Sequence, residues 1–103
     1  MSQNDILSRS VGWKVEFTGK AAKQYLKLPE QVRTVVDTLV MEIQITGPVR
    51  GNWKNYSKLD TTTHHCHLKS GKPTYVACWE VTDKTIRIVE VYYVGSRKDA
   101  PYD

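Results

Sequence analysis

Several hallmarks of other protein classes are missing from this chain of 103 residues. No stretch reaches the ~18 consecutive apolar residues that a membrane-spanning helix needs, and residues 1–11 lack the apolar segment of a secretory signal. Only two cysteines occur, Cys66 and Cys78, which is too few for a secreted disulfide framework. Their separation matches no zinc-binding spacing. We therefore expect a cytoplasmic protein with reduced thiols, no membrane contact and no metal or other cofactor.

The excess of positive over negative charge is also small, because 15 Lys and Arg against 11 Asp and Glu leave a net charge of only +4. Such an excess is weak evidence of a polyanionic partner by itself. Its distribution is more informative, since residues 48–79 contain five basic side chains and one acidic one, Asp60. The basic set either tracks a nucleic-acid backbone, which we predict, or forms a solubilising rim. Its members are Arg50, Lys54, Lys58, Lys69 and Lys72.

The spacing of apolar residues in the first half predicts a strand followed by two helices. Residues 13–17 alternate between apolar and polar, which is typical of a half-buried strand. A first helix is expected after Thr18, a good N-cap residue, and Pro29 ends it. A second helix follows from apolar residues at helical spacing over 32–43, and Gly47 closes it. Two helices joined by a proline turn are typical of an antiparallel hairpin.

The second half predicts a loop and three strands. The loop covers residues 49–62, and its Trp53 and Tyr56 either stack on bases or anchor it to the core. Turn signals then delimit strands at 64–68, 74–81 and 85–94. Because strands joined by short turns pair antiparallel, the predicted fold class is α+β, in the order β-α-α-β-β-β. The helix hairpin covers one sheet face and leaves the other open. Residues 13–103 form one domain, after a polar extension at 1–12.

Two histidines are predicted on the open face of the sheet. Side chains alternate along a strand, so His65 and His67 share one face while His64, Cys66 and Leu68 share the other. Cys66 and Leu68 suit the core, so we expect that second face to point to the core. The two imidazoles would lie about 7 Å apart, a spacing that spans a phosphodiester. Near neutral pH one imidazole can accept a proton while the other donates one, as RNA cleavage requires. The alternatives are solvated surface histidines, or a metal site that the alternation limits to two ligands from this run.

Two residues near the C-terminus complete the candidate site. Arg97 follows Gly95 at a strand end, where a guanidinium can grip a phosphate. Tyr102 can stack on a base or donate a hydrogen bond. The alternatives are an ion pair of Arg97 with a nearby aspartate, and a Tyr102 ring that packs against the sheet.

Taken together, these residues resemble the RelE/HigB-type toxins of bacterial type II toxin–antitoxin modules. The resemblance runs from Trp13 to Tyr102 and is most specific at the ending Val94-Gly-Ser-Arg97. It implies a mixed sheet in which the first strand inserts among the later ones. It also implies a ribosome-dependent, metal-independent endoribonuclease that cleaves mRNA in the ribosomal A site, together with a cognate antitoxin protein.

The resemblance also assigns roles by position. Arg97 matches the phosphate-stabilising arginine of the family, and Tyr102 matches its C-terminal tyrosine. The catalytic set implied in this way is His65, His67, Arg97 and Tyr102, the histidines standing where RelE has two catalytic lysines.

The chain departs from the RelE pattern at two positions. Val76 stands where RelE has a second arginine, and Asp60 stands where the family often has glycine. Two alternatives therefore stay open. One is a non-nuclease toxin like the ParE toxins, which share the fold and inhibit DNA gyrase but lack the cationic and acid–base set. The other is a catalytically degraded relative that only binds RNA.

Overall fold

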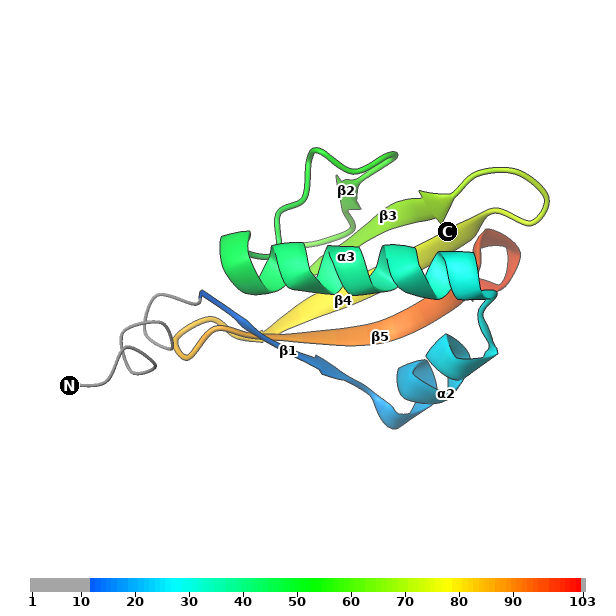
Figure 1. Ribbon diagram of the computed structural model, residues 1–103. Helices are drawn as coiled ribbons and strands as arrows, with labels where there is room; N and C mark the ends of the chain where they lie inside the picture. Colours follow the sequence, from blue (N-terminus) through cyan, green and yellow to red (C-terminus); the bar gives the residue numbers. More distant parts are fainter. Residues whose placement is uncertain (1–11, 103) are drawn as a thin grey trace.

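The structure is a computed structural model that describes residues 12–102. Two helices lie against one face of a sheet (Figure 1). The predicted extension at 1–12 falls outside the described residues except for Gly12. The elements are β1 (Lys14–Phe17), α2 (Gly19–Lys27), α3 (Glu30–Thr46), β2 (Ser57–Lys58), β3 (Thr63–Lys69), β4 (Tyr75–Asp83), β5 (Ile88–Ser96) and the 3-10 turn η1 (Arg97–Asp99).

Both predicted helices are confirmed, together with the signals that delimit them. Thr18 caps α2, because its hydroxyl oxygen accepts a hydrogen bond of 3.0 Å from the Ala21 backbone N–H. The helix stops at Leu28, the residue before proline. After α3 the backbone of Gly47 adopts a φ of 109°, a conformation that favours glycine. A Cβ at this position would also lie 3.1 Å from Nε1 of Trp13.

The five strands form one mixed sheet in the order β1-β5-β4-β3-β2. Strand β1 runs parallel to β5, and every other neighbouring pair is antiparallel. The expectation that the first strand inserts among the later ones is wrong, because β1 lies at the sheet edge. The α2–α3 hairpin follows β1 and leads the chain across one face of the sheet to β2 at the opposite edge (Figure 1).

Two strand boundaries also differ from the predictions. The region expected to be all loop contains β2, whose two residues pair with His64 and His65 of β3. Strand β5 begins at Ile88 instead of residue 85, because Oδ1 of Asp83 accepts backbone hydrogen bonds of 2.9 Å from Thr85 and Ile86 and so closes a turn. It also continues through Gly95, where the sequence predicted an end.

The main core lies between the helices and the sheet. Trp79 of β4 is its largest fully buried side chain and donates a hydrogen bond of 2.9 Å to the Pro48 carbonyl. His64 points into this core as predicted, and its ring stacks on Trp79 with centroids 5.8 Å apart. Its Nδ1 shares a hydrogen bond of 2.7 Å with the Tyr56 hydroxyl, so this buried imidazole is satisfied.

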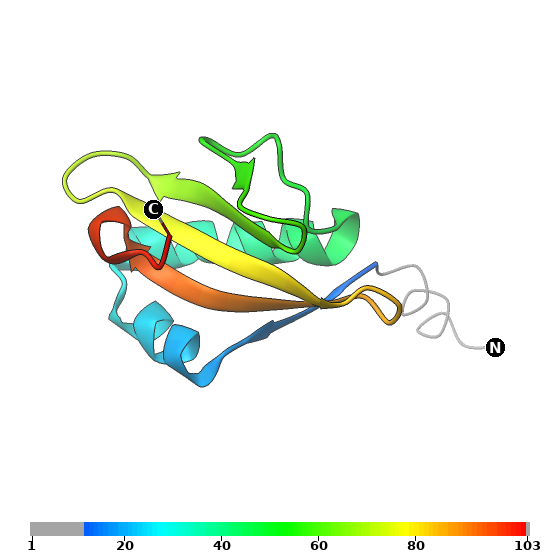
Figure 2. The same cartoon turned by 180° about the vertical axis from the view of Figure 1, so that it is seen from behind.

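The opposite face of the sheet is not open, which corrects the prediction. A second small cluster lies there, built on Val76, Cys78 and Tyr93, with Ala100 and Tyr102 packed against it. Figure 2 shows the C-terminal segment lying over β4 and β5 on the face away from α3. Within residues 12–102, no helix is long and apolar enough to cross a membrane.

Candidate functional site

The four predicted catalytic residues line one groove on the face away from the helices. His65 and His67 reach it from β3, Arg97 from η1 and Tyr102 from the segment that follows. The groove has a volume of about 430 Å³. Its opposite wall comes from the loop and strand before β3, namely Asn55, Tyr56, Ser57 and Leu59. Residues far apart in the sequence are thus brought together in one groove.

His65 is fixed in this groove from two sides. Its Nδ1 lies 2.9 Å from the Ser57 hydroxyl oxygen and 3.4 Å from the Ser57 carbonyl oxygen. The Tyr102 ring covers it, with centroids 4.5 Å apart, and leaves His65 only 8% exposed. Burial lowers the pKa of His65, and the positive charge of Arg97 adds to that effect, although the Ser57 hydrogen bond opposes it. The neutral imidazole is therefore favoured at neutral pH.

His67 stands beside His65, with ring centroids 6.4 Å apart and planes inclined by 67°. Among the described residues, no hydrogen-bond partner reaches its buried Nδ1. Burial lowers the pKa of His67, helped by the charges of Arg97, His65 and Lys54. A neutral imidazole with an unused nitrogen can accept a proton.

Tyr102 supplies a second unsatisfied polar atom in the groove. Its hydroxyl is buried and makes no hydrogen bond of good geometry within residues 12–102, although the Arg97 guanidinium is close enough to lower the pKa of Tyr102. Burial raises the pKa of Tyr102, so the phenol keeps its proton at neutral pH. Buried polar atoms without partners are rare in folded proteins and need an explanation. Two such atoms in one groove, on His67 and Tyr102, leave this part of the structure less completely hydrogen-bonded than the core around His64.

The glycine of the Gly95-Ser-Arg97 ending has a packing reason. The Tyr93 side chain passes over Gly95, and its hydroxyl donates a hydrogen bond of 2.6 Å to the Ser96 carbonyl. A Cβ at Gly95 would lie 2.8 Å from that hydroxyl, closer than real contacts allow. The chain then turns into η1, and the Arg97 backbone N–H donates to the Thr74 carbonyl at 2.7 Å. These contacts fix the backbone position from which the Arg97 side chain extends.

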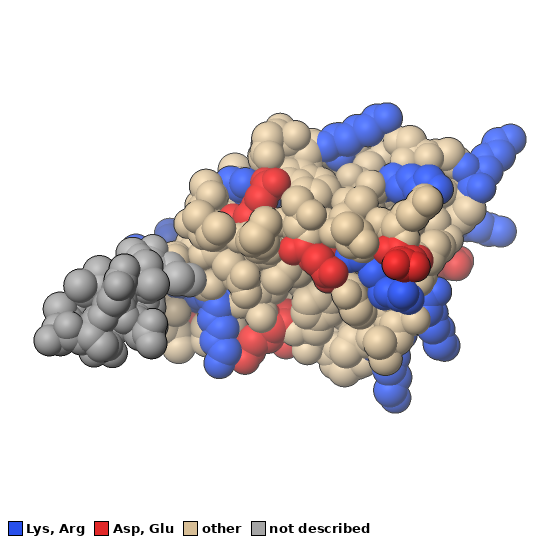
Figure 3. Space-filling view, viewed as in Figure 1, with Lys and Arg blue, Asp and Glu red and all other residues tan. Residues whose placement is uncertain are grey.

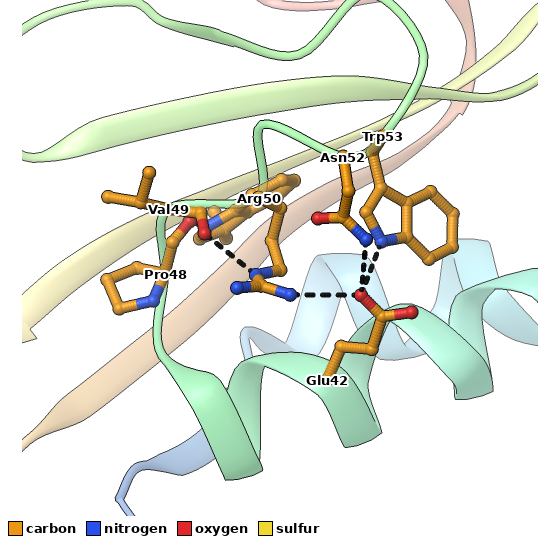
Figure 4. Close-up of polar contacts among 7 residues, drawn as sticks. Glu42, Pro48, Val49, Arg50, Asn52 and Trp53 are labelled. Carbon is orange, nitrogen blue, oxygen red and sulfur yellow. Dashed lines mark hydrogen bonds and ion pairs between the residues drawn. The ribbon is translucent and has the colours of Figure 1, made fainter.

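The opposite wall of the groove is tied to α3 by one carboxylate (Figure 4). Oε1 of Glu42 accepts hydrogen bonds from Arg50, Asn52 and Trp53 at 3.0, 3.0 and 2.9 Å. All three donors lower the pKa of Glu42, and the hydrogen bonds from Asn52 and Trp53 have the largest effects. A backbone hydrogen bond of 2.8 Å from His67 to Lys54 attaches the same loop to β3. No sequence signal marks Glu42, because its partners lie in a loop whose path the sequence leaves undetermined.

The predicted RNA-binding residues separate into two groups. Arg50 is turned away from the groove toward Glu42, and its side chain is only 11% exposed. Trp53 and Tyr56 anchor the loop instead of presenting a stacking surface, since both pack against the main core. The remaining basic residues are exposed, namely Lys54, Lys58, Lys69 and Lys72.

Charge on this face of the sheet changes from one end to the other. Glu16, Glu90 and Glu80 are partners across β1, β5 and β4, so they form an acidic row at the end near the β4–β5 turn. At the other end, the exposed Lys69 and Lys72 lie at the β3–β4 turn. Seen from the helix face, Lys and Arg side chains also gather at this end of the molecule (Figure 3). Val76, which the resemblance aligns with a second arginine of RelE, pairs with His67 and is fully buried.

The described residues hold no group of three or more His, Cys, Asp or Glu side chains that could bind a metal ion. Cys66 and Cys78 are buried as free thiols, and burial raises the pKa of each to about 12. Neither thiol is therefore a reactive thiolate at neutral pH.

Solved structures provide the comparison, because no family model and no curated protein matches the chain. It is similar to a double mutant of the E. coli toxin RelE in the free state, with a TM-score of 0.65 and 20% identity over 86% of this chain and 87% of that one. An archaeal RelE–RelB complex from Pyrococcus horikoshii gives 0.63 and 11%, over 86% and 99%. The intact E. coli RelBE toxin–antitoxin complex gives 0.56 and 20%, over 82% and 95%. The fold is thus that of RelE, as the α+β prediction and the resemblance implied.

Proposed function

We propose that this chain is the toxin of a type II toxin–antitoxin module and that it cleaves mRNA on the ribosome. The observation that carries the proposal is the shared groove of His65, His67, Arg97 and Tyr102. Those side chains supply a proton acceptor, a phosphate-binding cation and a proton donor, the set that RNA cleavage requires. The RelE fold gives the arrangement its biological context.

The first step is attack by the RNA itself. The His67 imidazole takes the proton of a 2′-hydroxyl, and the freed oxygen attacks the adjacent phosphorus. Because the pKa of His67 is lowered, the imidazole is neutral and ready to accept at neutral pH. Charge then accumulates on the phosphate oxygens, and the Arg97 guanidinium neutralises it through charge-assisted hydrogen bonds.

The second part of the reaction is departure of the 5′-oxygen. The P–O5′ bond breaks, and the Tyr102 phenol donates its proton to the leaving alkoxide, which is far more basic than a tyrosinate. His65, already bonded to Ser57, holds the Tyr102 ring over the groove. The products are a 2′,3′-cyclic phosphate and a 5′-hydroxyl. Water then returns the proton from His67 to Tyr102, and no step needs a metal ion.

The cognate partner in this proposal is an antitoxin protein. The E. coli and archaeal neighbours include complexes named for RelE and RelB. An acidic segment of such a protein would complement the exposed lysines around the groove. Co-expression of the neighbouring open reading frame should restore growth and yield a stable complex with this chain.

The test is induced expression followed by mapping of transcript 5′ ends. We expect growth arrest and mRNA cleavage within codons, and the purified protein should cut mRNA bound to programmed ribosomes. The matched variant is Arg97→Ala, which should abolish cleavage in a folded protein, while Lys23→Ala on α2 should behave like the wild type.

Other outcomes would favour the alternatives. Growth arrest with intact transcripts and gyrase-linked DNA breaks would replace this function with a ParE-like one. RNA binding without any cleavage would identify a degraded relative, for which the buried Val76 is the structural reason.

A further inference from the structure

A second hollow lies on the other side of Arg97 and Tyr102. It has a volume of about 420 Å³ and shares these two residues with the histidine groove. Its remaining wall comes from the β3–β4 turn and the start of η1, namely Gly71, Lys72, Pro73, Thr74, Ser96 and Lys98. The two hollows are therefore neighbours along one surface, with the Tyr102 side chain between them.

The lining of this hollow fits an anion. Lys72, Arg97 and Lys98 contribute three cations, and among the described residues no carboxylate lines the hollow, although Asp99 accepts a hydrogen bond of 3.2 Å from the lining residue Ser96. Both lysines are exposed, so their ammonium groups can adjust to a ligand. The Thr74 hydroxyl donates to the Gly71 carbonyl at 2.9 Å and so braces the turn that carries Lys72. The Arg97 backbone N–H on Thr74 ties the two walls together.

The position of the hollow restricts the path of a nucleic acid. At one end of the sheet face, the row of Glu16, Glu90 and Glu80 repels a polyanion. The hollow lies at the opposite end of β4 and β5, beyond Tyr75 and Ser96. An RNA strand that places one phosphate in the histidine groove is thus directed over Tyr102 toward Lys72 and Lys98.

We infer that this hollow is a second phosphate subsite, which binds the backbone phosphate next to the one that is cleaved. The inference rests on the proposed nuclease function and extends it. Lys72 and Lys98 supply positive charge on this face, where the chain has Val76 in place of the second RelE arginine. They act in binding the substrate and take no part in proton transfer.

The experiment removes two positive charges from the protein side of the predicted contact and one negative charge from the RNA side. Wild type and the double variant Lys72→Ala/Lys98→Ala cleave short synthetic mRNAs on programmed ribosomes under single-turnover conditions. In two of these mRNAs a neutral methylphosphonate replaces the phosphate just before or just after the cleavage site, and the 2′-oxygen beside that linkage is methylated. Reference mRNAs carry the 2′-methyl group alone. The double variant Lys20→Ala/Lys23→Ala, at two exposed positions of α2, is the charge-matched protein control.

We expect one of the two neutral linkages to weaken mRNA binding by the wild type, so that the half-saturating concentration rises about fivefold. This is the upper range for an exposed charge pair. The maximal rate should stay unchanged, and the double variant should show the same weakening on unmodified mRNA with no further loss on the neutral linkage. Equal loss in both proteins, or no loss in either, would overturn the subsite while leaving the nuclease function intact.

Two further results are decisive. A double variant that cleaves like the wild type but loses affinity for the antitoxin would show that the hollow is a protein contact and that the inference is wrong. Failure of the wild type to cleave any of these mRNAs would overturn the proposed function, and the subsite with it.

Discussion

His65 and His67 lie side by side with ring centroids 6.4 Å apart, yet their environments differ. Nδ1 of His65 is bonded to Ser57, whereas Nδ1 of His67 is buried without a partner among the described residues. The unused nitrogen makes His67 the proton acceptor of the proposed reaction. His65 is the positioning residue beneath Tyr102.

Replacement of His67 should therefore lower the rate of mRNA cleavage more than replacement of His65. We expect His67→Ala to lower the single-turnover rate of mRNA cleavage about 10²- to 10⁴-fold, the usual contribution of a general base. His65→Ala should retain more activity, because the base and the cation remain. The double variant should be inactive. Rates are measured on programmed ribosomes, with circular dichroism to confirm folding. A fully active His67→Ala variant would remove this residue from the mechanism.

Stability should fall below about pH 6.5, where an unfolded histidine begins to take up a proton. Burial lowers the pKa of His64, His65 and His67 in the folded chain. In that range the unfolded chain binds more protons than the folded one, so the free energy of unfolding decreases as the pH falls toward the folded pKa values.

Urea denaturation between pH 8 and pH 5 measures this dependence. His64→Gln removes one titrating group, so its pH dependence should be shallower than that of the wild type. An equally steep dependence in His64→Gln would show that this buried histidine does not contribute.

The Glu42 network should stabilise the groove from the far side of the sheet. In Glu42→Ala, hydrogen bonds to Arg50, Asn52 and Trp53 are lost together. The loss should be about 2 kcal/mol of unfolding free energy, in the range of a charge-assisted hydrogen bond. Cleavage should fall as well, because the loop that leads to Ser57 is released. Gln31→Ala, at an exposed position of the same helix, is the control for urea denaturation and cleavage assays.

Gly95→Ala should damage both packing and activity. The added Cβ meets the Tyr93 hydroxyl at 2.8 Å, and Tyr93 is only 6% exposed, so it has little room to move. Overpacking of this kind typically costs about 1–3 kcal/mol. Displacement of Ser96 would also move Arg97 from the groove. Gly19→Ala serves as the control, since nothing lies within 4 Å of its Cβ. A Gly95→Ala protein with wild-type melting and cleavage would contradict this packing account.

The sequence predicted the features that depend on local pattern. Helical periodicity and the signals at Thr18, Pro29 and Gly47 placed both helices. Strand alternation assigned His64 to the core and His65 and His67 to the other face, which the structure confirms. These features follow from the regular spacing at which side chains return to the same face of a helix or a strand, which can be recognised over a few neighbouring residues.

The features that were missed depend on contacts between distant segments. Strand β2 forms only because β3 offers a partner, and two residues carry no periodicity of their own. The role of Arg50 was predicted from charge alone, but its guanidinium is held by Glu42 of α3. The covered sheet face depends on where the tail folds back, and nothing in its sequence states that Tyr102 meets His65.

The parallel pairing of β1 with β5 has a consequence for how the protein is made. Strand β1 is synthesised early, but its partner is the last strand of the sheet, with Phe17 aligned to Val91. Contacts between such distant segments form late in folding. Arg97 and Tyr102 follow β5 in the chain, so the groove cannot form until β5 and the segment after it have been synthesised. Under the proposed function, a nascent chain that has not reached this point lacks the proposed catalytic set and cannot cleave the mRNA that encodes it.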